Sequence, residues 1–239
     1  NHPHYFDLLR VIIRHGDDGM LERASDWLLK NDTHPKYHEV LRAMITRKGG
    51  DESWLSRGEQ YVKMPHREHP EQIVVALLVS SRCNPKYIEI ALDHVYEVVT
   101  SSQRVYVLSN LARFSINNPS NAFAYLNGEF KEKRKRYFCR TLAWGLKRYH
   151  DKISKFLNCG FETTTPQYLS HIMQELIKLR VLSSELDDCL ITWLNKNWRQ
   201  LGYGGMLKFL RDNIVYWDRI CKSGKMDNQV KKDFESLKS

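Results

Sequence analysis

The sequence has no long apolar run. No segment approaches the roughly 20 consecutive apolar residues that a helix needs to cross a bilayer, and no signal-peptide pattern opens the chain. We therefore expect no membrane association. The chain begins at Asn1 rather than at a methionine, from which we expect a processed chain or a segment of a longer protein.

Cysteine is sparse and scattered. The five residues are Cys83, Cys139, Cys159, Cys189 and Cys221. No two of them form a CxxC pair, and their spacing fits neither a zinc site nor a disulfide framework. The pattern predicts reduced, mostly buried thiols in a cytoplasmic protein.

Motifs of catalysis and metal binding are missing as well. There is no GxSxG elbow, and GYGG at 202–205 lacks the Lys-Ser or Lys-Thr of a phosphate-binding loop. His34 and His38 are four residues apart and His66 and His69 three apart, but no cysteine or paired carboxylate stands near either pair. We predict no catalytic residue, no metal and no cofactor, while an acid–base pair assembled from distant residues stays open.

Alternating strand patterns are absent too, and the one Asn-Gly, at 127–128, joins two helical patterns. Instead, a helical unit recurs. Residues 22–47 align with 56–82 at an offset of 35, which places His34-Pro35 on His69-Pro70. Residues 87–114 repeat the plan, and 121–144 follow at an offset of 31.

This period, with two helices in each unit, predicts an all-α protein. We expect a right-handed α-solenoid of helical hairpins, with the second helices near Val40, Val75, Val107 and Phe138 stacked in one layer. The expected organisation is an array of about four helix pairs over 1–160, further helices that continue or cap it over 161–222, and a charged tail that frays over 223–239.

The short Trp-Leu helix, the His-Pro junction and the second helices VLRAMITR and VVALLVSS resemble degenerate tetratricopeptide-like and HEAT-like repeats. More narrowly, residues 17–148 resemble the sensor arrays of bacterial NLR-like (STAND or NACHT) immune proteins. The full tetratricopeptide consensus of Trp, Leu-Gly, Tyr and Pro is absent. The resemblance implies a ligand-sensing or scaffold segment in antiviral defence, without an active site of its own.

The positive charge of the chain is local. The net charge is +9, and residues 131–155 hold ten of the 37 basic residues but only two of the 28 acidic ones. Within this stretch an apolar stripe predicts an amphipathic helix; its members are Phe138, Leu142, Leu146, Tyr149, Ile153 and Phe156. On the opposite side lie cations and Trp144, so we predict a surface that binds a partner or phosphates. Its residues are Lys133, Arg134, Arg136, Tyr137, Arg140, Trp144, Lys147 and Arg148.

Three interpretations of this surface stay open: a hydrated helix face, a site for an acidic protein partner, or a site for nucleic acid. The favoured function is a non-catalytic module for protein–protein recognition. The alternative is a nucleic-acid-binding repeat protein, since the chain resembles small helical DNA-repair glycosylases in size and charge. The oligomeric state is left open.

Overall fold

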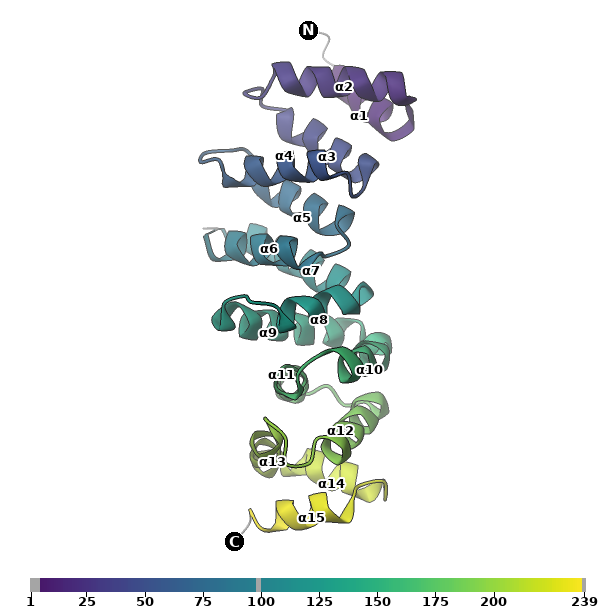
Figure 1. The fold of residues 1–239 in the computed structure, drawn as a ribbon, viewed down its shortest axis with the longest axis vertical. Helices are drawn as coiled ribbons and strands as arrows, with labels where there is room; N and C mark the ends of the chain where they lie inside the picture. Colours follow the sequence, from purple (N-terminus) through teal and green to yellow (C-terminus); the bar gives the residue numbers. More distant parts are fainter. Residues whose placement is uncertain (1–4, 98–99, 238–239) are drawn as a thin grey trace. The chain divides into compact units, whose positions relative to one another are not determined.

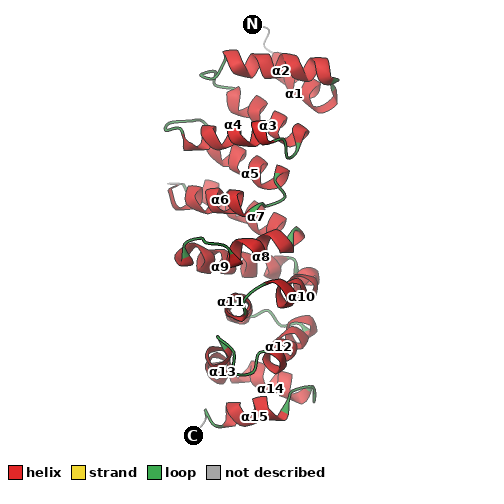
Figure 2. Cartoon of the chain, in the orientation of Figure 1, coloured by secondary structure: helices red, strands yellow, loops and turns green. Residues whose placement is uncertain are grey.

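The protein is all-helical. The computed structural model describes residues 5–97 and 100–237, with side chains from Leu9 onward except that of Arg10. These residues form fifteen α-helices and one 3-10 helix, and no strand occurs among them (Figures 1 and 2). The predicted all-α class is therefore confirmed. None of the helices in the described ranges is long and apolar enough to cross a membrane.

The chain divides into two compact units, 1–114 and 115–239. The first contains α1 (Tyr5–His15), α2 (Asp18–Lys30), α3 (Tyr37–Lys48), α4 (Glu52–Lys63), α5 (Pro70–Ser80), α6 (Pro85–Glu97) and most of α7 (Ser101–Asn117). The second contains α8 (Pro119–Asn127), α9 (Glu132–Arg148), η1 (His150–Lys152), α10 (Ile153–Thr163), α11 (Pro166–Lys178), α12 (Ser184–Lys196), α13 (Tyr203–Asp212), α14 (Ile214–Lys222) and α15 (Asn228–Glu235). The division expected between residues 160 and 161 lies inside the second of these units.

Local start signals place many of the helices. The carboxylate of Asp17 accepts a hydrogen bond from Met20 N and caps α2, and the hydroxyl of Ser183 accepts from Leu186 N and caps α12. Proline opens α5, α6, α8 and α11, where its missing N–H costs no hydrogen bond. Pro70 and Pro166 thus each begin a helix, and α7 begins at Ser101.

In the first unit, α3 packs against both α1 and α5, and α2, α4 and α6 pack beside them (Figure 1). Val40 of α3 and Val75 of α5 are buried, as expected for second helices in contact. Helix α4 comes close to this layer at Gly58. A Cβ there would lie 2.7 Å from Ile45 Cδ1 and 2.9 Å from Leu77 Cδ2, so only glycine fits without movement.

The second unit has two layers of helices. One is formed by α9, α11, α13 and α15, each packed against the next, and the other by α8, α10, α12 and α14. The apolar stripe Phe138, Leu142 and Leu146 of α9 is fully buried, and so are Ile153 and Phe156. These last two belong to α10, however. The predicted single stripe is broken because α9 ends at Arg148 and a 3-10 turn follows.

The expected frayed tail needs correction. Before the tail, α13 and α14 are two separate helices, because Asn213 leaves the helical conformation (φ −126°, ψ 54°). The charged tail contains α15, whose Phe234 is buried and stacks on Trp217 at 3.6 Å between ring centroids. Trp27 of α2 and Leu108 of α7 are only half-buried. Trp193 of α12 and Leu142 of α9 are fully buried.

Candidate functional site: the basic face of helix α9

Helix α9 separates its charged and apolar residues onto opposite sides. Its apolar stripe turns inward, as described above, and α11 packs against it. The residues on the other side recur at spacings of three and four, so they share one face of the helix. We call Lys133, Arg136, Arg140, Trp144 and Lys147 the basic face of α9; all five are exposed. The predicted amphipathic helix is therefore present at this position.

The remaining predicted site residues flank this face. Arg148 is exposed in the last turn of α9, where a cation also interacts favourably with the helix dipole. Arg134 and Tyr137 are half-buried. Of the eight predicted site residues, six are thus exposed and two are half-buried.

One cation of the stretch has a structural role. Lys135 is 7% exposed, its Nζ lies 3.3 Å from Tyr168 Oη, and its ammonium lies 5.2 Å from the centre of that ring. Tyr168 of α11 in turn donates to Glu132 Oε2 at 2.8 Å. Burial, together with this hydrogen bond to a carboxylate, raises the pKa of Tyr168 to about 12. Lys135 thus joins α9 to α11 and does not contribute to the exposed charge.

Two arginines of the basic face lie near carboxylates. Arg136 Nε is 3.5 Å from Glu132 Oε1, and Arg140 Nε is 3.8 Å from Glu175 Oε1 of α11. Glu175 also pairs with Lys178 at 2.7 Å. Pairs of this kind at an exposed surface are weak, so they lower the local positive charge without locking the side chains.

The other cations have no such partner. Within the described part of the chain, no ion pair or hydrogen bond engages the side chains of Lys133, Lys147 and Arg148. Trp144 is 41% exposed, and no described aromatic ring stacks on it. The basic face therefore presents the ammonium groups of Lys133 and Lys147 and the ring of Trp144 directly to solvent. The guanidinium of Arg148 is exposed next to it.

A histidine lies beside the face. His171 of α11 is half-buried, and its Nε2 is buried without a hydrogen-bond partner. Burial lowers the pKa of His171, and the nearby Arg136 guanidinium lowers it further. Near neutral pH this imidazole is thus uncharged and adds nothing to the positive charge of the face.

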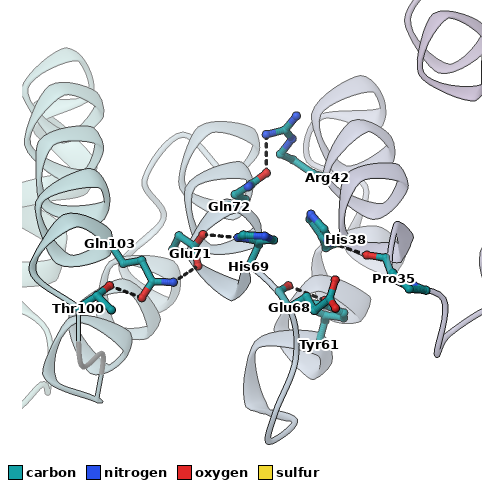
Figure 3. A network of polar contacts seen from close by, with 10 residues as sticks. All are labelled: Pro35, His38, Arg42, Tyr61, Glu68, His69, Glu71, Gln72, Thr100 and Gln103. Atoms are coloured by element: carbon teal, nitrogen blue, oxygen red, sulfur yellow. Dashed lines mark hydrogen bonds and ion pairs between the residues drawn. The ribbon is translucent and has the colours of Figure 1, made fainter. Parts of the chain in front are cut away.

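A second polar network lies in the first unit, at the start of α3, α5 and α7 (Figure 3). The rings of His38 and His69 lie 4.8 Å apart, and His69 Nδ1 lies 3.2 Å from Glu71 Oε1. The buried Glu71 also accepts from Gln103 Nε2 at 3.1 Å. The sequence reasoning treated His38 and His69 separately. The structure brings them together, because the two helices start side by side.

Two observations describe the metal-binding and nucleophilic groups near these regions. Among the described residues, no group of three or more His, Cys, Asp or Glu side chains could hold a metal ion. Cys139, next to the basic face in sequence, is buried, and burial raises the pKa of its thiol, which disfavours the nucleophilic thiolate. What the basic face can do is attract and contact an anionic surface.

The chain has no recognisable relatives in the comparisons: no protein-family model, no curated protein and no solved structure matches it.

Sequence reasoning missed the acidic neighbour of the face. Glu175 and Lys178 lie on α11, and nothing in their local pattern marks them as close to Arg140. The offset between Arg140 and Glu175 equals the repeat period of 35 residues noted above. That period was the signal that could have found the pair.

Proposed function

We propose that this chain is a non-catalytic helical-repeat module that recognises the acidic surface of another protein through the basic face of α9. The observation that carries the proposal is the exposure of Lys133, Trp144 and Lys147 on one side of a helix whose other side is fully buried. Exposed cations steer an acidic partner toward the face, and an exposed tryptophan supplies contact area once the partner arrives.

We propose further that the helices form a right-handed α-solenoid of hairpins. Hydrogen bonds between residues 29 to 39 positions apart join neighbouring helices and support this arrangement, and several of them join residues that are 35 apart. In the first unit, Arg67 donates to Asp32 O and Ser80 to Ile45 O, and each pair is 35 residues apart. In the second unit, Lys152 and Asn117, Lys196 and Phe161, Trp198 and Asp233, and Tyr216 and Val181 are joined at the same separation. Corresponding positions of successive repeats become neighbours in a solenoid.

The composition of the face favours a protein over a nucleic acid. A nucleic-acid groove combines a continuous positive track with several aromatic rings on which successive bases stack. Here, Glu132 and Glu175 stand beside the two arginines, and Trp144 is the one tryptophan of the face. An acidic protein surface can avoid these carboxylates and still meet Lys133 and Lys147. The role in immune sensing that the sequence resemblance implies stays a prediction.

The test is charge reversal on the whole chain. We would replace Lys133, Arg140 and Lys147 by Glu and measure binding of a glutamate-rich peptide and of a single-stranded DNA oligonucleotide. Loss of peptide binding through a slower, salt-dependent association rate is the expected result. The fold should be retained, because none of the three side chains is buried.

The matched control reverses three exposed lysines elsewhere in the same unit, Lys155, Lys222 and Lys232, with the same change of net charge. The control should bind the peptide almost as the original chain does. Equal losses in both variants would reject a localised site. A DNA affinity that exceeds that for the peptide and disappears with the basic face would favour the nucleic-acid function instead.

A further inference from the structure

A groove in the first unit is lined by three arginines. It lies over α1 and α3 and has a volume of about 460 Å³. The residues around it are Arg14, Arg42, Ala43, Thr46 and Arg47. No acidic residue belongs to this lining, and the nearby Asp18 of α2 pairs with Lys48 at 3.6 Å.

The three guanidinium groups are held differently. Arg42 is half-buried and donates from Nη1 to Gln72 Oε1 of α5 at 2.7 Å, as Figure 3 shows. One edge of its planar fork is thus fixed, and its other donors stay available. Arg14 and Arg47 are exposed, and no described side chain pairs with either of them.

Like charges around one groove repel one another, and no ion pair with a carboxylate of the described chain engages Arg14, Arg42 or Arg47. Arg14 and Arg47 lie in the last turns of their helices, where a cation interacts favourably with the dipole. That preference accounts for a basic residue at each helix end. It does not account for Arg42, which lines the same groove from the middle of α3. A bound anion would offset the repulsion.

We propose that this groove binds a phosphomonoester dianion and part of the molecule that carries it. Guanidinium groups match phosphate in two-point hydrogen bonding, and a dianion balances three cations better than a single carboxylate does. The volume lies in the range of small-molecule sites and exceeds what a phosphate group alone fills. The groove belongs to the first unit and the basic face of α9 to the second, so each can bind a ligand without the other.

The test uses the full chain and three probes: a phosphoserine peptide, a nucleoside monophosphate and inorganic phosphate. Isothermal titration gives the affinity of each, with the unphosphorylated peptide and the nucleoside as blanks. We expect at least one of the two esters to bind more tightly than its blank and than inorganic phosphate. Which ester binds more tightly identifies the source of the phosphate.

Substitution then locates the site. Replacing Arg14 and Arg47 by Gln should weaken ester binding at least tenfold. Replacing both by Lys should reduce the affinity less, because the positive charge remains and only the planar two-point hydrogen bonding of the guanidinium is lost. The control replaces Arg23 and Lys30 of α2 by Gln, with the same change of net charge and both side chains exposed. Circular dichroism of each variant shows that it is folded.

Two outcomes overturn the proposal: neither ester binds more tightly than its blank, or the control weakens binding as much as the groove variant does. Failure of ester binding at the groove can be told apart from failure of peptide binding at the basic face of α9. Charge reversal of Lys133, Arg140 and Lys147 in the other unit should leave ester binding within a factor of about two.

Discussion

Helices α5 and α9 correspond to each other in the predicted repeat, yet they meet solvent in different ways. In α5 every residue from Ile73 to Leu78 is buried, because α3, α4 and α6 all pack against it. In α9 burial follows one stripe, and the basic face opposite is exposed. A place in the repeat therefore does not decide whether a helix keeps a free face. The helices that pack against a helix decide whether one of its faces stays exposed.

A large loss of stability is expected where the two helices are alike, at their buried leucines. Leu78 of α5 and Leu142 of α9 are both fully buried. Replacing either by Ala should lower the free energy of unfolding by about 2–5 kcal/mol, because a cavity is left in a packed layer. Denaturant midpoints measure this. If Leu142→Ala leaves the midpoint unchanged, the inward orientation assigned to the α9 stripe is wrong.

The next effect tests how tightly α5 is enclosed. Gly58→Ala should destabilise by about 1–3 kcal/mol, since the added Cβ would press on the side chains of Ile45 and Leu77. A Cβ added at Gly204 of α13 would meet no atom within 4 Å, so Gly204→Ala is the matched control. It should stabilise by about 0.4–1 kcal/mol through lower entropy of the unfolded chain. A similar melting temperature for both variants would contradict the close approach of α4.

Tryptophan replacement separates an exposed from an enclosed aromatic within the second unit. Trp193 is fully buried, and Trp193→Ala should cost about 3–5 kcal/mol. Trp144 is 41% exposed, so Trp144→Ala should cost only about 1 kcal/mol. Its larger effect should be on partner affinity, by about 2 kcal/mol. Equal losses of stability in the two variants would place Trp144 inside the packing and remove it from the basic face.

The smallest effect is a dependence of stability on pH that is stronger in the first unit. Burial lowers the pKa values of His38 and His94 below the ordinary 6.5. As pH falls below about 6.5, the unfolded chain takes up protons that the folded chain refuses, so stability decreases. Carboxyl groups with lowered pKa values, such as Glu59, act only below their ordinary 4.5. The loss of stability between pH 6.5 and 4.5 therefore reports on these histidines and on His171 of the second unit. Asp187, whose pKa burial raises, acts in the opposite direction.

Urea unfolding at pH 7.5, 6 and 5 measures this slope, and His38→Gln should reduce it. His94→Gln should reduce it as well, because burial also lowers the pKa of His94. A stability that is constant between pH 7.5 and 5 would show that the environments of His38 and His94 do not disfavour protonation.

Much of the fold was accessible from the sequence because it follows from local rules. The absence of alternating strand patterns and the two-helix unit predicted the all-α class, and the spacing of Phe138, Leu142 and Leu146 identified the buried side of α9. The end of α9 at Arg148 was not accessible. The apolar spacing continues through Tyr149 to Phe156, and only the packing of α10 on α8 and α12 shows that the direction of the chain changes.

The sites were accessible only in part, for a similar reason. Exposure of Lys133 and Lys147 follows from helix periodicity, but the burial of Lys135 depends on Tyr168, which is 33 residues away. The arginine groove was missed altogether, because Arg14 and Arg42 come together only when α1 packs on α3. Contacts between helices that are distant in sequence are not visible in the pattern of either helix alone.

The central claim is that the free face of α9 is a recognition surface rather than a hydrated side of a repeat helix. The most direct measurement is the association rate of a glutamate-rich peptide with the full chain, before and after replacing Lys133, Arg140 and Lys147 by Glu, at low and at high salt. We predict that the rate falls at least tenfold at low salt, that high salt narrows the difference, and that melting is unchanged. Identical rates in the two proteins, with melting also unchanged, would contradict the account.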